Sequence, residues 1–599
     1  MADDQSTALL RGLTEPQREA VISEAAPLCV LAGAGSGKTT VLTRRVARRL
    51  FDRSAEASHT LVVTFTRKAS RQLRDRLWRL EVPGPVWAGT FHAAAYGQLR
   101  RHWADTGVRP PAVVADPRRL LRRVIEGPEE MAGETLGGVL AEIQWAQARL
   151  LGPADYANGA RAAARRAPLA VDQVAEIYGR YEAAKRTHGV IDLNDLLSRC
   201  AELLESDSAL AAAARWRIRH LFVDEFQDVN PAQWRLLNGW LGDRTDLFVV
   251  GDPRQAVYGW NGADPTLLDR LPVLIPGTTV LRLDANHRST PQVIAAATAV
   301  LAVNSDGPAG AGSGTGDFRR EAIGGRPDGP TPTVQGFDHD VEEARAVARW
   351  LRLMHRPGRP WSHLAVLART NARLGPVADA LQQAGIPFRV GPAPRTGAEL
   401  AAAIKALRAM PAGRPLRSAL ADLSIPDDRT AGTGRRTGPG IPAALSRLAD
   451  EHAVEEPGSS TGGFLAWLAA TAGDGAMAEA DPDGDAVELS TFHRAKGLEW
   501  PAVALIGLED GLVPISYATT VAARAEEQRL LYVAITRAEE HLWCSWARQR
   551  QAGDRAWTCR PSPLLDAIET VGRSGERAHR GSTLASQMAS LRQRLPVAG

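Results

Sequence analysis

Residues 221–234 read LFVDEFQDVNPAQW and are the most informative stretch of the 599-residue sequence. A short apolar run ends in Asp224 and Glu225, and further polar residues follow at once. A buried strand that delivers two adjacent carboxylates at its C-terminal end suits a Mg²⁺–nucleotide site, because one carboxylate can hold the metal and the other can accept a proton from the attacking water. The same pattern also fits a plain strand followed by an acidic turn, so other parts of the chain must decide.

Upstream, residues 28–50 have the pattern of a phosphate-binding loop. The apolar run 28–31 breaks into AGAGSGKTT at 32–40, and the helix-like stretch VLTRRVARRL follows. A strand, a glycine-rich turn and a helix start surround a phosphate with backbone N–H groups. Lys38 would neutralise the β and γ oxygens, and the Thr39 hydroxyl would ligate Mg²⁺. The loop residues of the predicted ATP site are Gly33, Ala34, Gly35, Ser36, Gly37, Lys38, Thr39 and Thr40.

The few lysines of the chain are informative because 72 residues are basic and nearly all of them are arginine. A lysine that persists in such a sequence is expected where a compact ammonium is required. Lys38, Lys68 and Lys496 fall inside motifs. Lys185 and Lys405 lie on helix-like stretches, and we predict that both are solvated surface residues.

Further motifs follow in a fixed order along the chain. They are TFTRKAS (64–70), GTFHAAAYGQLR (89–100), IDLNDLL (191–197), VVGDPRQAVYGWNGAD (249–264), LDANHRST (283–290), LARTNARLGPVADALQQAGIP (367–387), TFHRAKGLEWPAV (491–503) and EEQRLLYVAITRAEEHL (526–542). With the phosphate loop and VDEFQD, this series resembles the superfamily 1A DNA helicases of the UvrD/Rep/PcrA type, and the arginine bias resembles their actinobacterial branch. The resemblance implies an ATP-dependent 3′→5′ helicase or translocase on single-stranded DNA, acting in DNA repair or replication, with ATP and Mg²⁺ as cofactors.

The resemblance also implies an α/β fold with two RecA-like P-loop motor domains, each with a mainly helical insertion. The first motor domain would comprise residues 1–107 and 191–285, with its insertion at 108–190. The second would comprise 286–390 and 487–572, with its insertion at 391–486. The second insertion is short and rich in Gly, Pro, Ala and Ser, so we expect a reduced 2B domain. Residues 171–187, 401–409 and 442–452 are predicted to be helical.

Two other segments have a biased composition. Residues 304–332 are dominated by Gly, Asp, Pro and Ala, which predicts an extended and partly disordered surface loop. Residues 573–599 would form a disordered C-terminal tail with one weak helix at 584–595.

The family's catalytic residues map onto this sequence motif by motif. The first carboxylate of VDEFQD would bind Mg²⁺ together with Thr39, and the second would be the general base. The glutamine of GDPRQ would sense the γ-phosphate, and the arginines of NHRS and AITRA would grip it from the second motor domain. The implied catalytic set is Lys38, Asp224, Glu225, Gln255, Arg288 and Arg537.

The expected contacts to the nucleoside depart from the family pattern. Gln17 in LTEPQREAV would read the adenine edge, and Glu499 in KGLEW would contact the ribose. Many members carry arginine where this chain has Thr40, and tyrosine where it has His287. An imidazole can still stack on the base, and an arginine of the Arg44–Arg45 pair could replace the missing one.

Five residues lie in the family's DNA-contacting motifs: Phe65, His92, Tyr258, Trp260 and His493. Aromatic faces can stack on the bases of a single strand, although core packing is the commoner fate of tyrosine and tryptophan. Trp260 stands beside Gly259, Asn261 and Gly262, which favours an exposed loop. Asn261 stands where family members have arginine, so one DNA contact differs.

Composition adds weaker constraints. The net charge of +4 and the pI of about 9.0 agree with a nucleic-acid partner but do not require one. The four cysteines have no CxxC spacing, which argues against zinc and iron–sulfur modules. The acidic N-terminus and the lack of a long apolar run predict no signal peptide and no membrane segment. We expect a monomer in the bacterial cytoplasm, associated with the nucleoid, that binds single-stranded DNA and its junctions with duplex, and repair proteins.

Two alternatives to the helicase stay open at this stage. A reduced 2B domain could leave a translocase that displaces proteins from DNA or needs a partner to unwind. A DNA-binding subunit without catalytic activity is the third reading, and the intact catalytic set argues against it.

Overall fold

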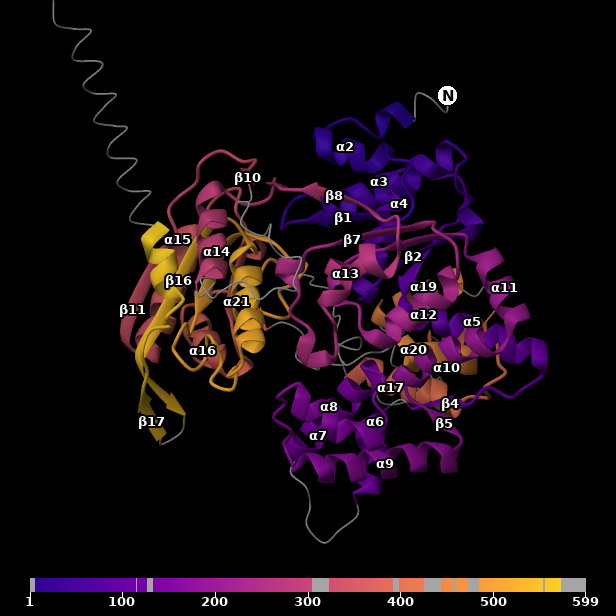
Figure 1. The fold of residues 1–599 in the computed structure, drawn as a ribbon. Helices are drawn as coiled ribbons and strands as arrows, with labels where there is room; N and C mark the ends of the chain where they lie inside the picture. Colours follow the sequence, from indigo (N-terminus) through magenta and orange to yellow (C-terminus); the bar gives the residue numbers. More distant parts are fainter. Residues whose placement is uncertain are drawn as a thin grey trace, which may run out of the picture.

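The computed structural model describes residues 6–114, 116–125, 133–303, 323–390, 398–424, 443–455, 459–471, 484–552 and 555–571. Two large β-sheets, one parallel and one mainly parallel, are each covered by helices on both faces and form the two halves of the molecule (Figure 1). This is the predicted α/β fold with two RecA-like motor domains.

The first motor domain is built on a six-stranded parallel sheet with the order β3-β2-β6-β7-β1-β8. Along β6, Leu221 and Val223 face one hydrophobic core while Phe222 faces the other. All three are fully buried, as expected for a parallel sheet that is covered on both faces. The strands are β1 (Leu28–Ala32), β2 (Thr60–Thr64), β3 (Trp87–Thr90), β6 (His220–Val223), β7 (Leu247–Gly251) and β8 (Thr279–Leu283).

Helices connect these strands and place the motifs at one edge of the sheet. Because all six strands are parallel, the loops after their carboxyl ends meet at the same edge. The phosphate loop follows β1, the carboxylate pair follows β6, and GDPRQ follows β7. The helices are α2 (Glu15–Ile22), α3 (Lys38–Phe51), α4 (Arg67–Arg79), α5 (Phe91–Thr106), α10 (Leu193–Ser206), α11 (Ser208–Arg217), α12 (Pro231–Leu241) and α13 (Thr266–Leu274).

A helical unit lies between α5 and α10 and has its own hydrophobic core. The short strands β4 (Ala112–Val113) and β5 (Val190–Ile191) pair in parallel at its base. The predicted helix 171–187 is confirmed as α9, whereas the exact limits of the insertion stay a prediction. The helices are α6 (Pro117–Val124), α7 (Gly133–Ala148), α8 (Pro153–Ala162) and α9 (Val171–His188).

The second motor domain has a sheet with the order β11-β16-β15-β12-β14-β13, in which β17 pairs antiparallel with β16. The strands are β11 (Thr333–His339), β12 (Leu364–Ala368), β13 (Phe388–Val390), β14 (Val487–Thr491), β15 (Trp500–Ile506), β16 (Ala538–Ala552) and β17 (Arg555–Thr558). Its main helices are α14 (Pro291–Ala302), α15 (Asp340–Met354), α16 (Gly375–Gln383) and α21 (Val521–Ile535). The strand pair β9 (Ala285–Asn286) and β10 (Ile323–Gly324) lies where the chain enters this domain.

The segment between β13 and β14 contributes four short helices: α17 (Ala398–Ala409), α18 (Leu416–Ser424), α19 (Ala443–Glu455) and α20 (Thr461–Thr471). Both predicted helices are confirmed, as α17 and α19. These helices leave the second motor domain but pack on the first, where α20 contacts α5 and β4 (Figure 1). The Arg67 guanidinium lies 5.0 Å from the ring centroid of Trp467 and donates a 3.3 Å hydrogen bond to the Leu468 carbonyl. The segment therefore forms a strap between the two motor domains.

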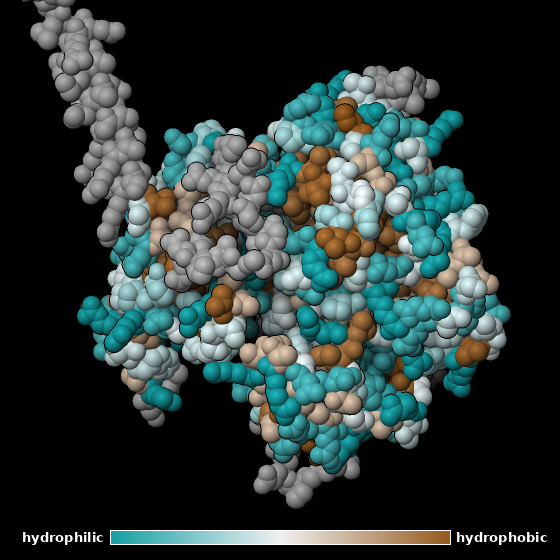
Figure 2. All heavy atoms as spheres, viewed as in Figure 1, coloured by the Kyte–Doolittle hydropathy of each residue, from teal (hydrophilic) through white to brown (hydrophobic). Residues whose placement is uncertain are grey.

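Some sequence predictions concern segments that lie wholly or partly outside the described residues. Residues 304–322 of the predicted loop 304–332 lie outside the described residues, and its end includes β10. The tail 573–599, with the predicted helix 584–595, also lies outside them. Within the described ranges, no helix has the length and apolar composition needed to cross a bilayer. On the face shown in Figure 2, hydrophobic residues form small separate groups among hydrophilic ones.

The prediction that Lys185 is a solvated surface residue is wrong. Lys185 is 2% exposed, and its Nζ lies 2.8 Å from both Asp192 and Asp195 and 3.0 Å from Glu182. Burial raises the pKa of Glu182 and of Asp195, where Asp192 adds to the effect. Helix periodicity indicated α9 correctly but did not show that this face of it meets the start of α10. Lys405 is exposed, as predicted.

We expect Lys185→Met to destabilise the protein by about 3–5 kcal/mol, because the buried carboxylates lose their counter-charge. The loss should be smaller at pH 5 than at pH 8, because Lys185 lowers the pKa of these carboxyls, and without it they take up protons at low pH and lose their unpaired charge. Thermal and urea unfolding of the full chain measure both effects. Lys405→Met is the matched control, and an equal effect in both variants would contradict the buried role of Lys185.

Candidate functional site

The phosphate loop turns sharply between β1 and α3. Gly35 and Gly37 have φ values of 67° and 84°, a region that favours glycine, and α3 begins at Lys38. A Cβ added at Gly35 would lie 2.7 Å from side-chain atoms of both Asn286 and Arg288. Residues that lead into the second motor domain therefore lie directly against the loop.

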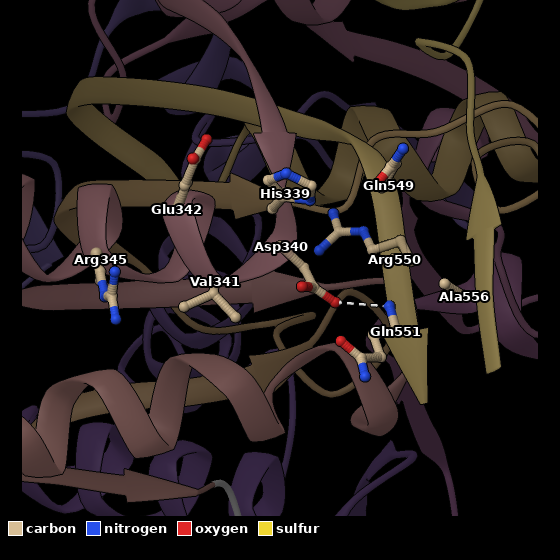
Figure 3. Close-up of a pocket in the computed structure, with 9 residues that line it drawn as sticks. All are labelled: His339, Asp340, Val341, Glu342, Arg345, Gln549, Arg550, Gln551 and Ala556. Atoms are coloured by element: carbon tan, nitrogen blue, oxygen red, sulfur yellow. Dashed lines mark hydrogen bonds between the residues drawn. The ribbon is translucent and has the colours of Figure 1, made fainter. Parts of the chain in front are cut away.

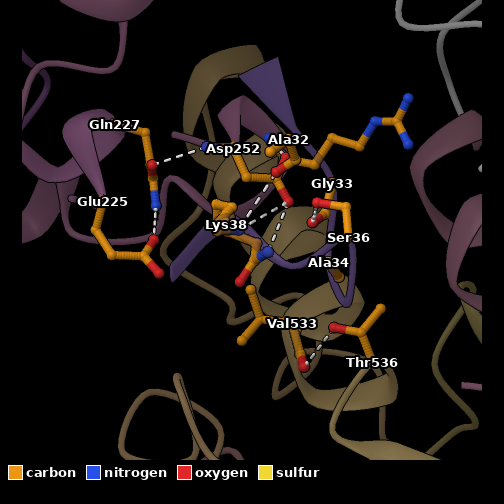
Figure 4. A network of polar contacts seen from close by, with 12 residues as sticks. Ala32, Gly33, Ala34, Ser36, Lys38, Glu225, Gln227, Asp252, Val533 and Thr536 are labelled. Atoms are coloured by element: carbon orange, nitrogen blue, oxygen red, sulfur yellow. Dashed lines mark hydrogen bonds and ion pairs between the residues drawn. The ribbon is translucent and has the colours of Figure 1, made fainter. Parts of the chain in front are cut away.

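Lys38 is nearly buried at the start of α3. Its Nζ donates a 3.3 Å hydrogen bond to the Ala32 carbonyl and lies 3.8 Å from Asp252 Oδ2. Asp252 follows β7, so the ammonium is held between the loops of two neighbouring strands (Figure 4). A compact cation beside a helix N-terminus has the charge and the size to bind phosphate oxygens.

The carboxylate pair lies at the end of β6. Glu225 has a left-handed backbone conformation, with φ 52° and ψ 40°, which is strained for a residue with a side chain. Its carboxylate accepts a hydrogen bond from Gln227 Nε2, and Gln227 Oε1 accepts one of 2.8 Å from the Asp252 amide (Figure 4). Gln227 is fully buried, and its side-chain amide connects the Glu225 carboxylate to the loop that carries Asp252.

The pKa values of the two adjacent carboxyls are shifted in opposite directions. Burial and the neighbouring Glu225 charge raise the pKa of Asp224. Burial alone would raise the pKa of Glu225 too, but the charges of Lys38 and Lys496 and the Gln227 hydrogen bond outweigh it and lower that pKa. A bound divalent cation reverses such a shift at a carboxylate that it contacts. Glu225 is therefore the more stable anion of the pair, and Asp224 keeps its proton more readily.

A series of polar side-chain contacts runs from the first motor domain to the second. Gln255 Nε2 donates a 2.6 Å hydrogen bond to Asp252 Oδ2, and Gln255 Oε1 lies 3.5 Å from Arg537 Nη2. Arg537 is 1% exposed and is fixed by hydrogen bonds to the carbonyls of Leu498 (3.0 Å) and Val533 (2.8 Å). Burial and the nearby Arg288 lower the pKa of Arg537 to about 9. One polar network built on Asp252 and Gln227 thus contains four of the predicted catalytic residues: Lys38, Glu225, Gln255 and Arg537.

Asn286 is a residue of this site that the sequence did not single out. It is 1% exposed, and its Nδ2 donates a 2.6 Å hydrogen bond to the Ala34 carbonyl of the phosphate loop. Its Oδ1 accepts from the amides of Arg288 (2.8 Å) and Ser289 (2.7 Å). Asn286 thereby sets the position of Arg288 relative to the loop. Its place in the NHRS motif was the only available signal.

The predicted nucleoside contacts surround the same loop. Gln17 Nε2 donates a 2.9 Å hydrogen bond to the Ser36 carbonyl, and Gln17 Oε1 accepts one from the Thr14 amide. The amide of His287 donates to the Gly35 carbonyl at 2.9 Å, and the imidazole is exposed. Arg288 and Glu499, predicted to act on the γ-phosphate and on the ribose, form an ion pair with each other.

The suggestion that Arg44 or Arg45 replaces the missing arginine beside adenine is not supported. Arg45 is 3% exposed and binds the carbonyls of Ala20 and Ser23 at the end of α2. Arg44 Nη1 binds the carbonyls of Leu9 and Arg11. Both guanidinium groups thus anchor the N-terminal segment to α3. Thr40 lies one turn earlier on the same helix.

Three of the predicted DNA-contacting residues form a row across the two motor domains. The ring centroids of Tyr258 and Trp260 are 6.3 Å apart, and those of Trp260 and His493 are 6.1 Å apart. Trp260 is 50% exposed, as its glycine-rich surroundings predicted. Phe65 and His92 follow β2 and β3. Phe65 packs at 5.8 Å against the buried Phe91, so part of its surface belongs to the core.

Lys496 connects this row to the loop that carries Gln255. Its Nζ donates hydrogen bonds of 2.8 Å to Asp228 and to the Gln255 carbonyl, and it lies 4.9 Å from the ring centroid of Tyr258. Lys496 comes from the second motor domain, and the other three residues come from the first. The sequence marked Lys496 as unusual but gave it no role.

A cavity of about 270 Å³ lies elsewhere, between the start of α15 and the strands β16 and β17 (Figure 3). Asp340 there accepts a 3.0 Å hydrogen bond from the Gln551 amide. Arg550 at its wall is buried in ion pairs with Glu343 and Glu509. This cavity contains none of the predicted site residues, and its polar groups stabilise the second motor domain.

The donor set between the motor domains fits Mg²⁺ and a nucleoside triphosphate: a phosphate loop with a lysine, a hydroxyl and a carboxylate for the metal, and two arginines facing them.

Comparison with known proteins agrees with this assignment. The family models of the UvrD/REP helicase N-terminal domain and the UvrD-like helicase C-terminal domain match residues 13–273, and 281–392 with 445–549. The chain is 38% identical to ATP-dependent DNA helicase UvrD2 of Mycobacterium tuberculosis, over 95% of this chain and 83% of that protein. It is 28% identical to DNA helicase II of Escherichia coli, over 94% and 88% of the two chains. The matches span both motor domains, and the chain belongs to the UvrD/Rep helicase family.

Proposed function

We propose that the protein is an ATP-dependent DNA helicase that moves 3′→5′ on single-stranded DNA, in DNA repair or replication. The observation that carries the proposal is the polar network that joins Lys38 to Arg537 across the cleft and continues through Lys496 to Tyr258. The relatives are named as ATP-dependent DNA helicases, which supports the activity. The direction rests on family resemblance.

The proposed hydrolysis uses residues from both motor domains. Lys38 and the phosphate-loop amides would bind the β and γ phosphates, and Thr39 with Asp224 would hold Mg²⁺, whose bound charge stabilises the transition state. Glu225, kept ionised by nearby cations, would orient the attacking water and take its proton. Arg288 and Arg537 would stabilise charge on the transferred phosphoryl group.

Coupling to DNA would run through the loop that carries Gln255 and Tyr258. These two residues are three positions apart, and Lys496 binds one and lies over the ring of the other. A movement of Gln255 toward the γ-phosphate would therefore displace Tyr258 and its neighbour Trp260. Alternating grip of these aromatic faces on successive bases would convert each cycle into a step.

A translocase that strips proteins from DNA, or needs a partner to unwind, is the second candidate. The strap of α17–α20 favours it, because only these four short helices are described between β13 and β14. A subunit without catalytic activity is disfavoured by the connected catalytic network. We further propose a cytoplasmic, nucleoid-associated monomer that binds junctions of single-stranded and duplex DNA.

Lys38→Ala should lower DNA-stimulated ATP hydrolysis by at least about 100-fold, because the phosphate oxygens lose their main cationic partner. Steady-state hydrolysis with a saturating oligonucleotide measures this loss. Lys405→Ala, which removes an exposed lysine, is the control. A fully active Lys38→Ala variant would refute the assigned nucleotide site.

Gln17→Ala should reduce the preference for ATP over GTP by roughly tenfold or more, because the side chain that both donates and accepts is removed. The ratio of kcat/KM for the two nucleotides measures it. Gln233→Ala is the control, since Gln233 has the same capping role at the start of α12. An unchanged ratio in Gln17→Ala would show that another group selects the base.

A duplex with a 3′ single-stranded tail should be unwound at least about tenfold faster than one with a 5′ tail, a difference of about 1.4 kcal/mol in the barrier. Strand separation and ATP hydrolysis are measured together on 3′-tailed, 5′-tailed and blunt duplexes. Faster unwinding of the 5′ tail would contradict the proposed direction. Strong hydrolysis with little unwinding of any substrate would favour the translocase.

A further inference from the structure

The loop that carries Trp260 is held from two sides. Residues 258–262, hereafter the Trp260 loop, contain a short 3-10 turn at Gly259–Asn261, and Trp260 itself is half exposed. The amide of Gly259 and the carbonyl of Trp260 belong to neighbouring residues, and each has a partner in a different domain. Because both contacts are made to the backbone, they fix the orientation of Trp260 and do not use its ring.

Glu526 on α21 is the partner from the second motor domain. Its Oε1 accepts a 3.0 Å hydrogen bond from the Gly259 amide. A Cβ added at Gly259 would lie 2.6 Å from Glu526 Oε2, and the three nearest atoms all belong to that carboxylate. One turn further along α21, Arg529 Nε donates a 2.8 Å hydrogen bond to the Ala256 carbonyl. Residues three apart lie on the same face of a helix, so this face of α21 holds the chain before and within the Trp260 loop at two points.

Arg165 is the partner from the helical insertion. Its Nη1 donates a 3.2 Å hydrogen bond to the Trp260 carbonyl. The same guanidinium binds the buried Glu142 carboxylate through its Nε and Nη2, and it lies 4.4 Å from the ring centroid of Trp145. A guanidinium that binds a carboxylate with two nitrogens has a fixed orientation. The insertion therefore supplies a rigid support for this side of the Trp260 loop.

Helix α21 also leads to the candidate nucleotide site. It runs as one helix over Val521–Ile535, and Arg537 follows two residues later. Arg537 Nε donates a 2.8 Å hydrogen bond to the Val533 carbonyl in the last turn of this helix. Glu526 and Arg537 are therefore attached to the same element. A displacement of α21 that moves Arg537 toward a phosphate would move Glu526 as well.

We propose that Glu526 is a positioning residue that carries movement of the second motor domain to Trp260, while Arg165 holds the other side of the Trp260 loop on the insertion. The inference rests on the proposed function, in which Trp260 stacks on a base. It provides a link from Arg537 to the DNA-contacting row that does not pass through Gln255 or Lys496. A purely structural role of Glu526 is the alternative, and it would weaken DNA binding to the same extent with and without a nucleotide.

The test measures the Kd of the full chain for a fluorescent oligo(dT) single strand, with and without a non-hydrolysable ATP analogue. In the parent protein we expect the two Kd values to differ about fivefold, as for one hydrogen bond that is made in only one of two states. In Glu526→Ala their ratio should approach one, because this hydrogen bond is lost in both states. An equal ratio in the parent and in Glu526→Ala would overturn the proposal.

Three further variants test the hydrogen bond itself. Glu526→Gln keeps an oxygen that can accept from the Gly259 amide, so it should preserve most of the parent's ratio. Gly259→Ala should reduce the ratio as Glu526→Ala does, because the added Cβ displaces the carboxylate, and it replaces Glu526→Ala if that variant fails to fold. Glu342→Ala, at an exposed glutamate of α15 in the same domain, is the matched control and should have no effect. A Glu526→Gln variant as impaired as Glu526→Ala, or a normal Gly259→Ala variant, would refute a role through this hydrogen bond.

The two ends of the proposed link are tested separately. The double variant of Glu526→Ala and Trp260→Ala should have the Kd values of Trp260→Ala alone, because Glu526 acts through Trp260, and additive effects would overturn the positioning role. Arg165→Lys keeps a charge beside Glu142 but loses the guanidinium fork, so both Kd values should rise, and no rise would refute the role of the insertion. If Glu526→Ala has the parent's ratio while Trp260→Ala weakens DNA binding, the positioning role fails but the proposed function stands. If both variants are normal, the proposed DNA site itself fails.

Discussion

The buried ammonium of Lys38 is the group on which the arrangement of the cleft depends. A cation removed from water needs a compensating charge, and here that charge is Asp252 at the end of a neighbouring strand. The Asp252 carboxylate also accepts a hydrogen bond from the Gln255 side-chain amide, and the Gln255 side-chain oxygen lies 3.5 Å from Arg537 of the other motor domain. An anion that binds Lys38 in place of Asp252 would therefore disturb a series of contacts that ends at Arg537 of the second motor domain. In the proposed mechanism, these few polar groups would link nucleotide binding to closure of the two motor domains.

Two further connections join the motor domains. Lys496 reaches across the cleft to Asp228 and lies over Tyr258, and α17–α20 strap the second domain to α5 of the first. The first connection is polar and lies at the cleft, so it can respond to the charge of a nucleotide. The second is mainly hydrophobic, with Phe464 and Trp467 in the core of the first domain, and Arg67 adds a cation–π contact and a hydrogen bond.

The sequence predicted local features well. The phosphate loop, the strand before Asp224 and the helices α9, α17 and α19 follow from short patterns of apolar residues, glycines and polar groups, which act over one turn or one strand. It failed where a partner lies far along the chain. Lys185 was predicted to be exposed, and the Arg44–Arg45 pair was assigned a possible role beside the base, because the faces that they meet belong to other elements. Asn286 escaped notice because its partner, the Ala34 carbonyl, is 252 residues away.

By itself, the sequence indicated the phosphate loop and the carboxylate pair through local patterns, and its ordered motifs carried the family resemblance that implied the two-motor α/β fold and the candidate nucleotide and DNA residues. Only the tertiary structure decided which of these groups share a network. It paired Gln227 with Glu225 and Asp252, Lys496 with Asp228, and Asn194 with Gln147. The physical reason is that a hydrogen bond or ion pair depends on distances of a few ångströms between side chains, and those distances are set by how whole elements pack rather than by neighbours in sequence.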